Sequence, residues 1–159
     1  MQLKDAFSPH QGATKLIVET IKTAKASIHV AAYSFESKAV ANALIAAHKR
    51  GVDVKIVLDS KQAGHIMVAW VKENGIDVRC NDHYSIMHDK FMVVDGRTLE
   101  LGSFNYSEAA EKSNAENVLV LTNAFTIASD YDKQFTKLWD EALIPKKHTT
   151  RKKGLTHAN

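Results

Sequence analysis

Residues 88–105 read HDKFMVVDGRTLELGSFN, and this stretch predicts a β-hairpin. The turn dipeptide Asp95-Gly96 stands between an apolar run and a run of β-favouring residues, which is the pattern of two antiparallel strands joined by a tight turn. The expected strands cover roughly 88–94 and 98–102. Polar residues with catalytic potential lie at the outer ends of both strands.

These polar residues have complementary chemistry. Because side chains alternate along a strand, His88 and Lys90 should point to the same face of the sheet. Ser103 and Asn105 have the same two-residue offset at the exit of the second strand. The hairpin would therefore bring an imidazole, an ammonium, a hydroxyl and an amide into one small volume. This set suits a phosphate diester, since it offers a nucleophile, a fixed positive charge and neutral donors for the non-bridging oxygens.

The order of these residues resembles the signature of the phospholipase D superfamily, H-x-K-x4-D-x6-G-S-x-N. The residues that carry it are His88, Lys90, Asp95, Gly102, Ser103 and Asn105. The likeness covers roughly residues 12–145 and includes the segments 32–35 and 50–54 and the pair Glu116-Asn117. The single copy in a short chain is similar to the bacterial endonuclease (Nuc-like) branch of that superfamily, and the sequence has no internal repeat and no second H-x-K.

The resemblance implies a metal-independent phosphodiesterase that hydrolyses DNA, or RNA, with little sequence preference. The family uses two motif copies, so a one-copy chain implies a homodimer with both His88 side chains at one interface. One His88 would attack phosphorus and form a phosphohistidine, while the other would protonate the leaving oxygen. No cofactor and no metal are implied, because two lysines supply the positive charge.

The resemblance also gives roles to the neighbouring residues. Lys90 from each subunit would neutralise the non-bridging oxygens, Asn105 would donate its amide to them, and Ser103 would complete the phosphate cradle. Glu116 matches the family position that accepts a hydrogen bond from the far ring nitrogen of the histidine, which fixes its tautomer. Four side chains thus surround the proposed nucleophile.

Other conspicuous residues have plainer interpretations. Asp95 is expected to be structural because Asp-Gly is turn chemistry, and Gly102 to permit a close backbone approach. The aromatic residues Tyr33, Phe35 and Phe104 stand near predicted strand ends. They either stack on nucleic-acid bases or pack in the core, and core packing is the more common role.

Composition predicts one domain over residues 1–145 followed by a basic tail. The chain has 159 residues and is 45% hydrophobic, enough for a substantial core. Residues 146–159 contain five lysines and arginines and no acidic residue, which predicts a disordered tail suited to polyanions. Without this tail the formal charge is about −2. The single cysteine, Cys80, excludes an intrachain disulfide.

The first ten residues do not have the apolar core of a signal peptide. The expected location is therefore cytoplasmic if the chain is complete, and periplasmic or secreted if a leader has been removed. No stretch approaches the ~20 apolar residues of a membrane span, so no integral membrane contact is expected.

Apolar patterns elsewhere predict strands that alternate with helices. Helices are expected at 13–25, from Ser37 to Gly51, around 66–71 and from Asn123 to Pro145; strands are expected at 27–35, 52–58, 76–80 and 117–121, with a polar loop or short helix at 106–114. Ser37 and Asn123 are the predicted helix caps. This alternation, together with the hairpin, predicts an α/β fold whose mixed sheet is flanked by helices on both faces, an α/β/α sandwich.

Three alternatives stay open. Cys80, His83 and His88 form a C-x2-H-x4-H pattern that supplies three potential zinc ligands, although it would use the histidine that the stronger motif requires. The same active site hydrolyses phospholipids in other superfamily members, so a phospholipid is the alternative substrate, without an apolar interfacial helix to support it. A non-catalytic nucleic-acid-binding module is the third possibility, and the intact motif argues against it.

Overall fold

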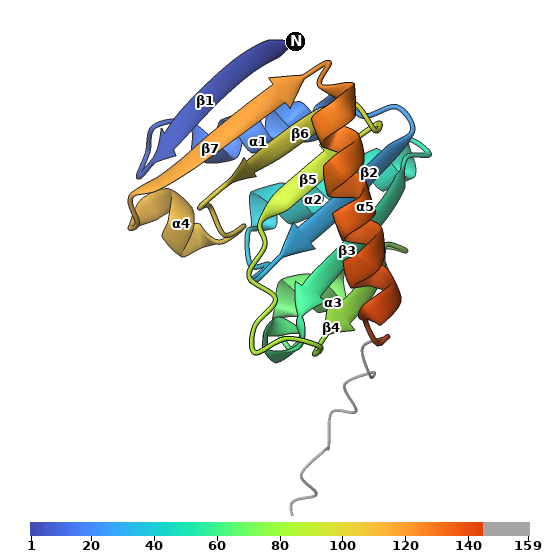
Figure 1. Ribbon diagram of the computed structural model, residues 1–159. Coiled ribbons are helices and arrows are strands. Elements are labelled where there is room, and N and C mark those ends of the chain that lie inside the picture. Colours follow the sequence, from blue (N-terminus) through green and yellow to red (C-terminus); the bar gives the residue numbers. More distant parts are fainter. Residues whose placement is uncertain (145–159) are drawn as a thin grey trace, which may run out of the picture.

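The computed structural model describes residues 1–144 and has a seven-stranded sheet as its central layer (Figure 1). The strands are β1 (Gln2–Ser8), β2 (Ser27–Ala32), β3 (Asp53–Asp59), β4 (Asp77–Asn81), β5 (Phe91–Val94), β6 (Thr98–Gly102) and β7 (Glu116–Thr122). The helices are α1 (Ala13–Lys22), α2 (Lys38–Lys49), α3 (Ile66–Glu73), α4 (Glu108–Lys112) and α5 (Phe125–Glu141), with a 3-10 turn at Ser60–Gln62. The basic tail predicted at 146–159 lies outside the described residues.

The sheet is mixed, as the sequence predicts. Its strand order is β1-β7-β6-β5-β2-β3-β4. Strands β2, β3 and β4 are parallel, and every other neighbouring pair is antiparallel. The parallel part comes from two strand-helix-strand units, because helices α2 and α3 connect β2 to β3 and β3 to β4. The antiparallel part contains the predicted hairpin, β5–β6.

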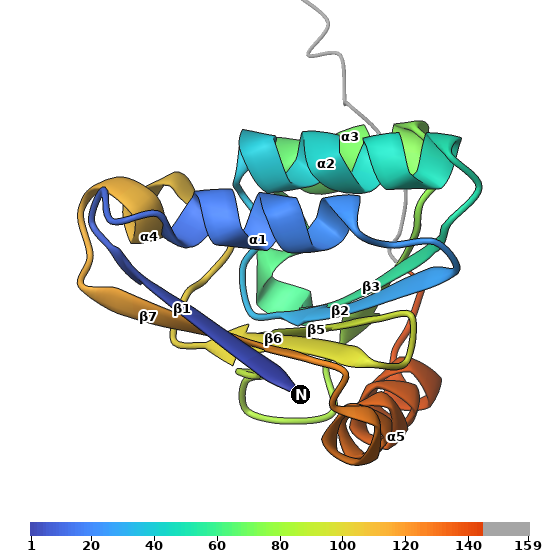
Figure 2. The ribbon, with the colours of Figure 1, turned by 90° about the horizontal axis from the view of Figure 1, so that it is seen from above.

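Helices cover both faces of the sheet (Figure 2). Helices α1, α2 and α3 lie on one face, and a large apolar core that includes Ile17, Leu44 and Ile56 fills the space beneath them. Helix α5 lies alone on the other face, over a smaller core that includes Val93 and Phe135. The expected α/β/α sandwich is therefore confirmed.

The two predicted helix caps have different outcomes. The Ser37 hydroxyl accepts a hydrogen bond from the Val40 amide at 3.2 Å, so it caps α2 as predicted. The prediction for Asn123 is wrong, because Ala124 is the N-cap of α5 and no side chain caps it. Asn123 has a left-handed backbone, with φ of 54°, and its side-chain oxygen accepts from the Arg97 guanidinium instead.

Two strand predictions also need correction. The first strand of the hairpin begins at Phe91 and not near residue 88, so His88 and Lys90 precede it. The edge strand β1 has no counterpart among the predicted elements, although it pairs with β7 along its whole length. Its first four residues are exposed and three of them, Gln2, Lys4 and Asp5, are polar, which hides a strand whose partner lies far away in sequence.

No helix within residues 1–144 combines the length and the apolar character that crossing a membrane requires.

Candidate active site

One edge of the sheet gathers the predicted site residues. The carboxyl ends of β2 and β6 and the amino ends of β5 and β7 meet there, since Ala31 pairs with Phe91, Phe91 with Leu101, and Gly102 with Val118. The segment before β5 carries His88 and Lys90, and the segment after β6 carries the Ser-x-Asn pair. Antiparallel pairing therefore places the two halves of the motif at the same edge.

His88 and Lys90 lie in a loop, which corrects the argument from strand alternation. The Lys90 ammonium donates to the carbonyl oxygen of His88 at 2.9 Å, so the lysine side chain folds back toward the residue two positions earlier. His88 is exposed and Lys90 is half-buried. Loop geometry, and not the pleat of a strand, brings these two groups together.

A buried carboxylate holds this loop in place. Asp59, at the end of β3, is 1% exposed and accepts hydrogen bonds from the amides of Met87 at 2.8 Å and Lys61 at 3.0 Å. The Lys61 ammonium donates to the Ser85 carbonyl at 2.9 Å, which fixes the same loop a second time. Sequence reasoning missed this role, and the only available signal was an aspartate at the carboxyl end of a buried strand. The amide next to His88 is thereby anchored to the parallel part of the sheet.

The His88 ring packs against an aromatic neighbour. Tyr33, just after β2, meets the imidazole edge to face, with 4.9 Å between ring centroids and 66° between planes. Gln62 donates to the Tyr33 hydroxyl at 3.3 Å. Tyr33 is half-buried, whereas Phe35 and Phe104 are 0% and 1% exposed and belong to the core. Of the three aromatic residues near the motif, Tyr33 is the one that contacts the proposed nucleophile.

The segment after β6 lies close against the start of β7. Gly102 has no room for a side chain, because an added Cβ would stand 2.1 Å from the Asn117 carbonyl oxygen. The Ser103 amide donates to that oxygen at 3.1 Å, and the Ser103 hydroxyl accepts from the Asn117 amide at 3.0 Å. The hydroxyl can still donate its proton to a ligand. Gly102 thus has the close backbone approach that the sequence suggested.

Asn105 has an unusual feature for a structural residue. Its side-chain oxygen Oδ1 is buried, and within residues 1–144 it has no hydrogen-bond partner. A buried polar atom without a partner costs about 1–3 kcal/mol. The amide can present either its oxygen or its NH2 group at this position by turning about its terminal bond. An amide kept unsatisfied in the segment after β6, at the end of the sheet where β5 begins, is suited to a ligand.

Opposing effects act on Lys90. Burial lowers the pKa of its ammonium, while the carboxylates of Glu116 and Asp89 act to raise it, and the net direction is downward. Glu116 is half-buried at the start of β7, and its amide donates to the Ser8 hydroxyl at 3.1 Å. Among the described residues no hydrogen bond joins Glu116 to His88, so this chain alone does not form the contact that the resemblance implies. Glu116 lies instead within electrostatic reach of Lys90.

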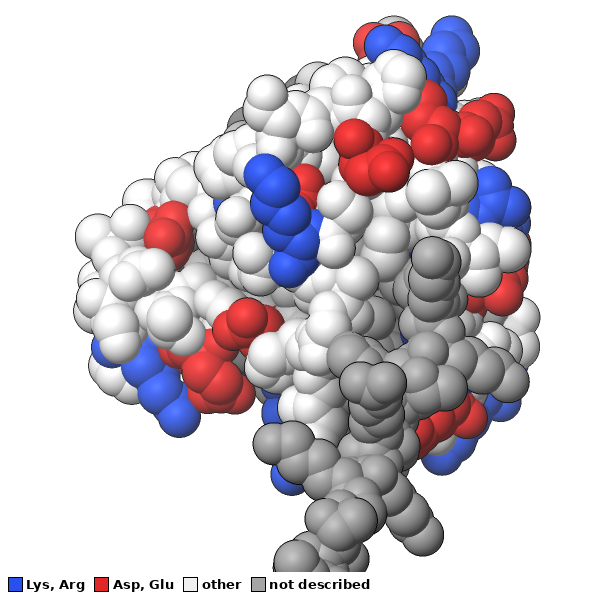
Figure 3. Space-filling model, turned by 90° about the horizontal axis from the view of Figure 1, so that it is seen from below, with Lys and Arg blue, Asp and Glu red and all other residues white. Residues whose placement is uncertain are grey.

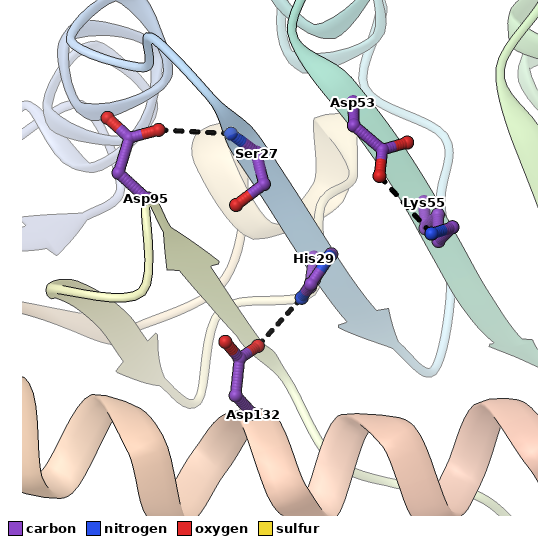
Figure 4. Close-up of polar contacts among 6 residues, drawn as sticks. All are labelled: Ser27, His29, Asp53, Lys55, Asp95 and Asp132. Atoms are coloured by element: carbon purple, nitrogen blue, oxygen red, sulfur yellow. Dashed lines mark hydrogen bonds and ion pairs between the residues drawn. The ribbon is translucent and has the colours of Figure 1, made fainter.

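Asp95 lies at the opposite edge of the sheet, away from His88. Its carboxylate accepts hydrogen bonds from three successive amides, those of Lys25, Ala26 and Ser27, at 2.7–3.1 Å. Figure 4 shows the hydrogen bond from Ser27. Burial raises the pKa of Asp95, but these backbone hydrogen bonds outweigh burial and hold the pKa below its ordinary value. Asp95 joins the hairpin turn to the start of β2, and these contacts are structural.

The zinc alternative is wrong. Within residues 1–144 no group of three His, Cys, Asp or Glu side chains could hold a metal ion. Cys80 is buried in β4, and burial raises the pKa of its thiol to about 11. His83 packs on Tyr84, with ring centroids 5.2 Å apart, while His88 packs on Tyr33. The three residues of the pattern therefore face different surroundings.

An α/β/α fold that gathers an H-x-K loop, a Ser-x-Asn segment and a glutamate at one sheet edge defines a phospholipase D-like domain. The chain belongs to the phospholipase D superfamily, and the family described as "Cardiolipin synthase, PLD-like domain" matches residues 17–139. Nuc from Salmonella typhimurium, a phospholipase D family member of known structure, superposes with a TM-score of 0.87 at 35% identity, covering 92% of this chain and 99% of that one.

Other relatives agree with this assignment. NucT from Helicobacter pylori shares the fold, with a TM-score of 0.78 at 21% identity over 91% of this chain and 100% of that one. Phospholipase D of Rickettsia bellii is 36% identical over 125 residues, or 77% of this chain and 62% of the relative. Mitochondrial cardiolipin hydrolase of Xenopus laevis is 33% identical over 137 residues, or 84% and 64%. The chain spans less than two thirds of the length of these two curated relatives, whose names are those of phosphodiester hydrolases.

Proposed function

We propose that this protein is a metal-independent phosphodiesterase that hydrolyses DNA, or RNA, with little sequence preference. The observation that carries the proposal is the convergence of His88, Lys90, Asn105 and Glu116 on one sheet edge of a chain that has a single H-x-K motif. The similarity to Nuc over almost the whole of both chains supports this substrate class. The proposed activity needs no group beyond the side chains themselves.

The proposed reaction has two displacements at phosphorus. In the first, a neutral His88 imidazole attacks, a phosphorus–nitrogen bond forms, and the phosphorus–oxygen bond to the leaving group breaks. A second, protonated His88 gives its proton to the departing oxygen. In the second displacement, water attacks the phosphohistidine, the second histidine takes the proton of that water, and the phosphorus–nitrogen bond breaks. The imidazoles return to their starting states.

This sequence of steps needs two histidines in opposite protonation states, and each chain supplies one motif. We therefore propose a two-fold homodimer in which the same surface of each subunit supplies one His88 and one Lys90. The exposure of His88 supports this arrangement, because an imidazole at the surface is available to a second chain. The lowered pKa of Lys90 is consistent with a half-buried ammonium whose positive charge a phosphate would stabilise.

Mixing subunits tests the dimer and the paired histidines together. Wild-type and His88→Ala chains would be mixed in equal amounts, allowed to exchange, and assayed on single-stranded DNA in excess chelator. If each centre needs two histidines, about a quarter of the dimers keep both, so activity per wild-type chain should fall by about half. Activity per wild-type chain that does not change on mixing would contradict the paired site. Loss of all cleavage in chelator, with recovery in Mg²⁺ or Zn²⁺, would contradict the metal-independent reaction.

Glu116→Gln tests the predicted role of the glutamate. Loss of the carboxylate should lower turnover by about 10²–10⁴, or somewhat less, because the imidazole loses orientation and its cationic form loses stabilisation. Dimerisation and thermal unfolding should stay unchanged. Wild-type turnover in this variant would mean that another residue holds the ring.

Phospholipid hydrolysis is a second candidate function, because several relatives carry the names phospholipase D and mitochondrial cardiolipin hydrolase. The same two displacements would serve a lipid diester equally well. Parallel assays with single-stranded DNA, single-stranded RNA and cardiolipin vesicles would distinguish the substrates. Hydrolysis of the vesicles alone would favour the lipid, and tight DNA binding without cleavage would favour a non-catalytic module.

A further inference from the structure

A groove of about 480 Å³ begins at His88 and runs along helix α5. One wall is the loop that carries His88, with Tyr84, Ile86 and Asp89, and the other wall is the face of α5 that carries Gln134 and Lys137. None of these wall residues belongs to the signature motif. Because the groove starts at the proposed nucleophile, a substrate bound through its phosphate at His88 would extend into it.

Tyr84 is a fixed aromatic surface at the rim of this groove. Its side chain is 39% exposed, yet its hydroxyl donates to the Glu141 carboxylate at 2.8 Å. The Glu141 carboxylate also pairs with the His83 imidazole at 3.3 Å, and the His83 ring packs edge to face on Tyr84. An exposed aromatic ring is therefore held from two sides, and a pre-positioned ring loses little conformational entropy when a ligand stacks on it.

The charges around the groove leave one lysine unpaired. Glu141 is engaged by Tyr84 and His83, and Asp89 lies within electrostatic reach of the Lys90 ammonium. Lys137 takes part in none of the ion pairs formed within residues 1–144. On the underside of the described part, lysines and arginines are scattered among aspartates and glutamates and form no continuous basic patch (Figure 3). Because this surface has no continuous basic patch, the Lys137 ammonium is expected to contribute strongly to the binding of an anion in the groove.

We infer that this groove binds the nucleotide that flanks the scissile phosphate of a single-stranded nucleic acid, with its base stacked on Tyr84 and the next phosphate at Lys137. The inference rests on the proposed function, and it names the residues that would make a single-stranded nucleic acid the preferred substrate. A single strand fits because its bases are free to stack on an aromatic ring, whereas those of a duplex are already stacked on one another. The Gln134 amide can donate to or accept from a base edge.

The lining of the groove favours a nucleotide over a lipid. A lipid chain would need a continuous apolar surface, but Ile86 is the one exposed aliphatic residue among charged and polar neighbours. A fixed aromatic ring beside a cation and an amide is the combination that binds single-stranded nucleic acid by stacking and by phosphate contact.

Binding and cleavage together test the inference. Lys137→Gln and Tyr84→Leu would be compared with two controls: Lys133→Gln, one turn earlier on α5 in a different groove, and Tyr84→Phe, which keeps the ring. Each change would also be made in a His88→Ala background, so that binding can be measured without cleavage. Binding of a fluorescein-labelled single-stranded DNA would be measured by anisotropy. The DNA would have ~12 nucleotides, enough to span a typical single-strand site. Active variants would be assayed on the same oligonucleotide and on bis(4-nitrophenyl) phosphate.

Tyr84→Leu should weaken oligonucleotide binding about fivefold to a hundredfold, the range of one base-stacking contact. Lys137→Gln should flatten the dependence of log affinity on log salt by about 0.7, the contribution of one phosphate contact on a single strand. In both variants the ratio of kcat/KM for the oligonucleotide to that for the small diester should fall. Lys133→Gln should keep the wild-type ratio, and Tyr84→Phe should keep most of it.

Several results would overturn the inference. Wild-type oligonucleotide affinity in both Tyr84→Leu and Lys137→Gln would remove the groove from the binding site. If Tyr84→Leu and Lys137→Gln lost activity on cardiolipin vesicles but kept activity on the oligonucleotide, the groove would be a lipid site. Dissociation of a dimer by Tyr84→Leu would make it a subunit interface. Failure of the wild-type protein to cleave either diester would refute the proposed catalysis, while the anisotropy measurement would still decide whether the groove binds DNA.

Discussion

At the scale of single residues, the carboxylate of Asp59 is a group that ties the loop carrying His88 to the sheet. It is almost completely buried and accepts two backbone hydrogen bonds, one of them from the residue before His88. Hydrogen bonds to a buried charge contribute more than ordinary ones because neither partner is compensated by water when the bond is lost. The position of the proposed nucleophile is therefore expected to depend on a residue outside the motif.

Asp59→Asn should lower both stability and turnover. The amide keeps the size of the side chain but loses the charge and one acceptor, so the expected loss of unfolding free energy is about 1–3 kcal/mol, measured in urea. Turnover on a small diester should fall as well, because the loop before His88 is less firmly held. Asp53→Asn, at the exposed start of the same strand, is the control: its ion pair with Lys55 is a surface one, worth about 0–1 kcal/mol. Equal effects of the two substitutions would contradict the anchoring role.

Glu100 gives a second prediction at this scale. Its carboxyl is 1% exposed within β6 and accepts from the Tyr106 hydroxyl at 2.6 Å. Burial raises the pKa of Glu100 to about 8 from an ordinary value of 4.5, although the Tyr106 hydrogen bond acts to lower it. Between these two pH values the folded protein holds a proton that the unfolded chain has released. Stability from this group is therefore complete below pH 4.5 and is lost as pH rises toward 8.

Glu100→Gln should remove that part of the pH dependence, which is at most about 1.4 kcal/mol per pH unit. Urea unfolding at pH 5, 6, 7 and 8 would measure it, and the variant should gain stability relative to wild type as the pH rises. Glu108→Gln, exposed on α4, should follow the wild-type curve. Parallel curves for Glu100→Gln and wild type would show that the buried carboxyl does not titrate in this range.

At the scale of elements, helix α5 is the one helix within residues 1–144 that covers its face of the sheet (Figure 2). One of its polar links to the sheet is the hydrogen bond between His29 Nδ1 on β2 and the Asp132 carboxylate, at 2.7 Å (Figure 4). Arg79 and Asn81 on β4 donate to carbonyl oxygens near the end of the helix, each at 3.0 Å. The His29 ring also stacks on Phe135, with 4.7 Å between centroids. These contacts fix the helix that supplies one wall of the groove beside His88.

Asp132→Asn should loosen α5. The substitution replaces a charge-assisted hydrogen bond by a neutral one, and the expected cost is about 0.5–1.5 kcal/mol of unfolding free energy. Amide hydrogen exchange along α5 should rise at the same time. Asp130→Asn, exposed on the same helix, should change stability by less than about 0.5 kcal/mol. Identical exchange in the two variants would argue against a docking role for the pair.

The elements differ in how well sequence alone predicted them. Local signals sufficed for α2, whose cap Ser37 and terminating Gly51 lie within the element or next to it. They failed where a distant contact decides the structure. Asn123 is a preferred capping residue, but Arg97 from the hairpin turn engages its side chain and its backbone is left-handed. The loop at His88 is held by the carboxylate of Asp59, which accepts a hydrogen bond from the Met87 amide. These two residues are 28 positions apart, and no local pattern reveals the contact.

The candidate site divides in the same way. The candidate residues His88, Lys90, Asn105 and Glu116 were predicted from spacing and resemblance, and their roles stay predictions. The supporting role of Asp59 was not predicted, and Tyr33 was named only as a residue that stacks on bases or packs in the core. An aspartate or a tyrosine at a strand end has many common roles. Tertiary packing decides which residues hold the candidate side chains in place, and packing depends on the whole fold.

At the scale of the whole molecule, charge is unevenly distributed along the chain. Residues 1–145 carry a formal charge of about −2, while residues 146–159 contain five lysines and arginines. Phosphate contacts by such a segment are independent of sequence and sensitive to salt. The tail is therefore expected to capture polyanions for a body that has no excess of positive charge.

Deleting residues 146–159 should flatten the dependence of duplex-DNA affinity on salt. Each phosphate contact contributes roughly 0.9 to the slope of log affinity against log salt, so the slope should decrease by several units if most of these charges engage. Hydrolysis of a small diester should not change, because the proposed catalytic residues lie elsewhere. A full-length variant with the five basic residues replaced by glutamine is the matched control for length. Equal slopes for full-length and truncated protein would mean that the tail only improves solubility.

The edge strand β1 imposes an order on how the sheet is assembled. Ser8 pairs with Glu116, 108 residues further along, so β1 leaves the ribosome well before its partner strand β7 has been synthesised. Until then Leu3 and Phe7, which stay half-exposed or more even in the finished sheet, belong to a strand without a neighbour. Contacts of such long separation form late, because closing the loop costs entropy before any pairing is gained. The nascent chain is therefore expected to pair its parallel strands β2, β3 and β4 first and to add β1 last, at the opposite edge of the sheet.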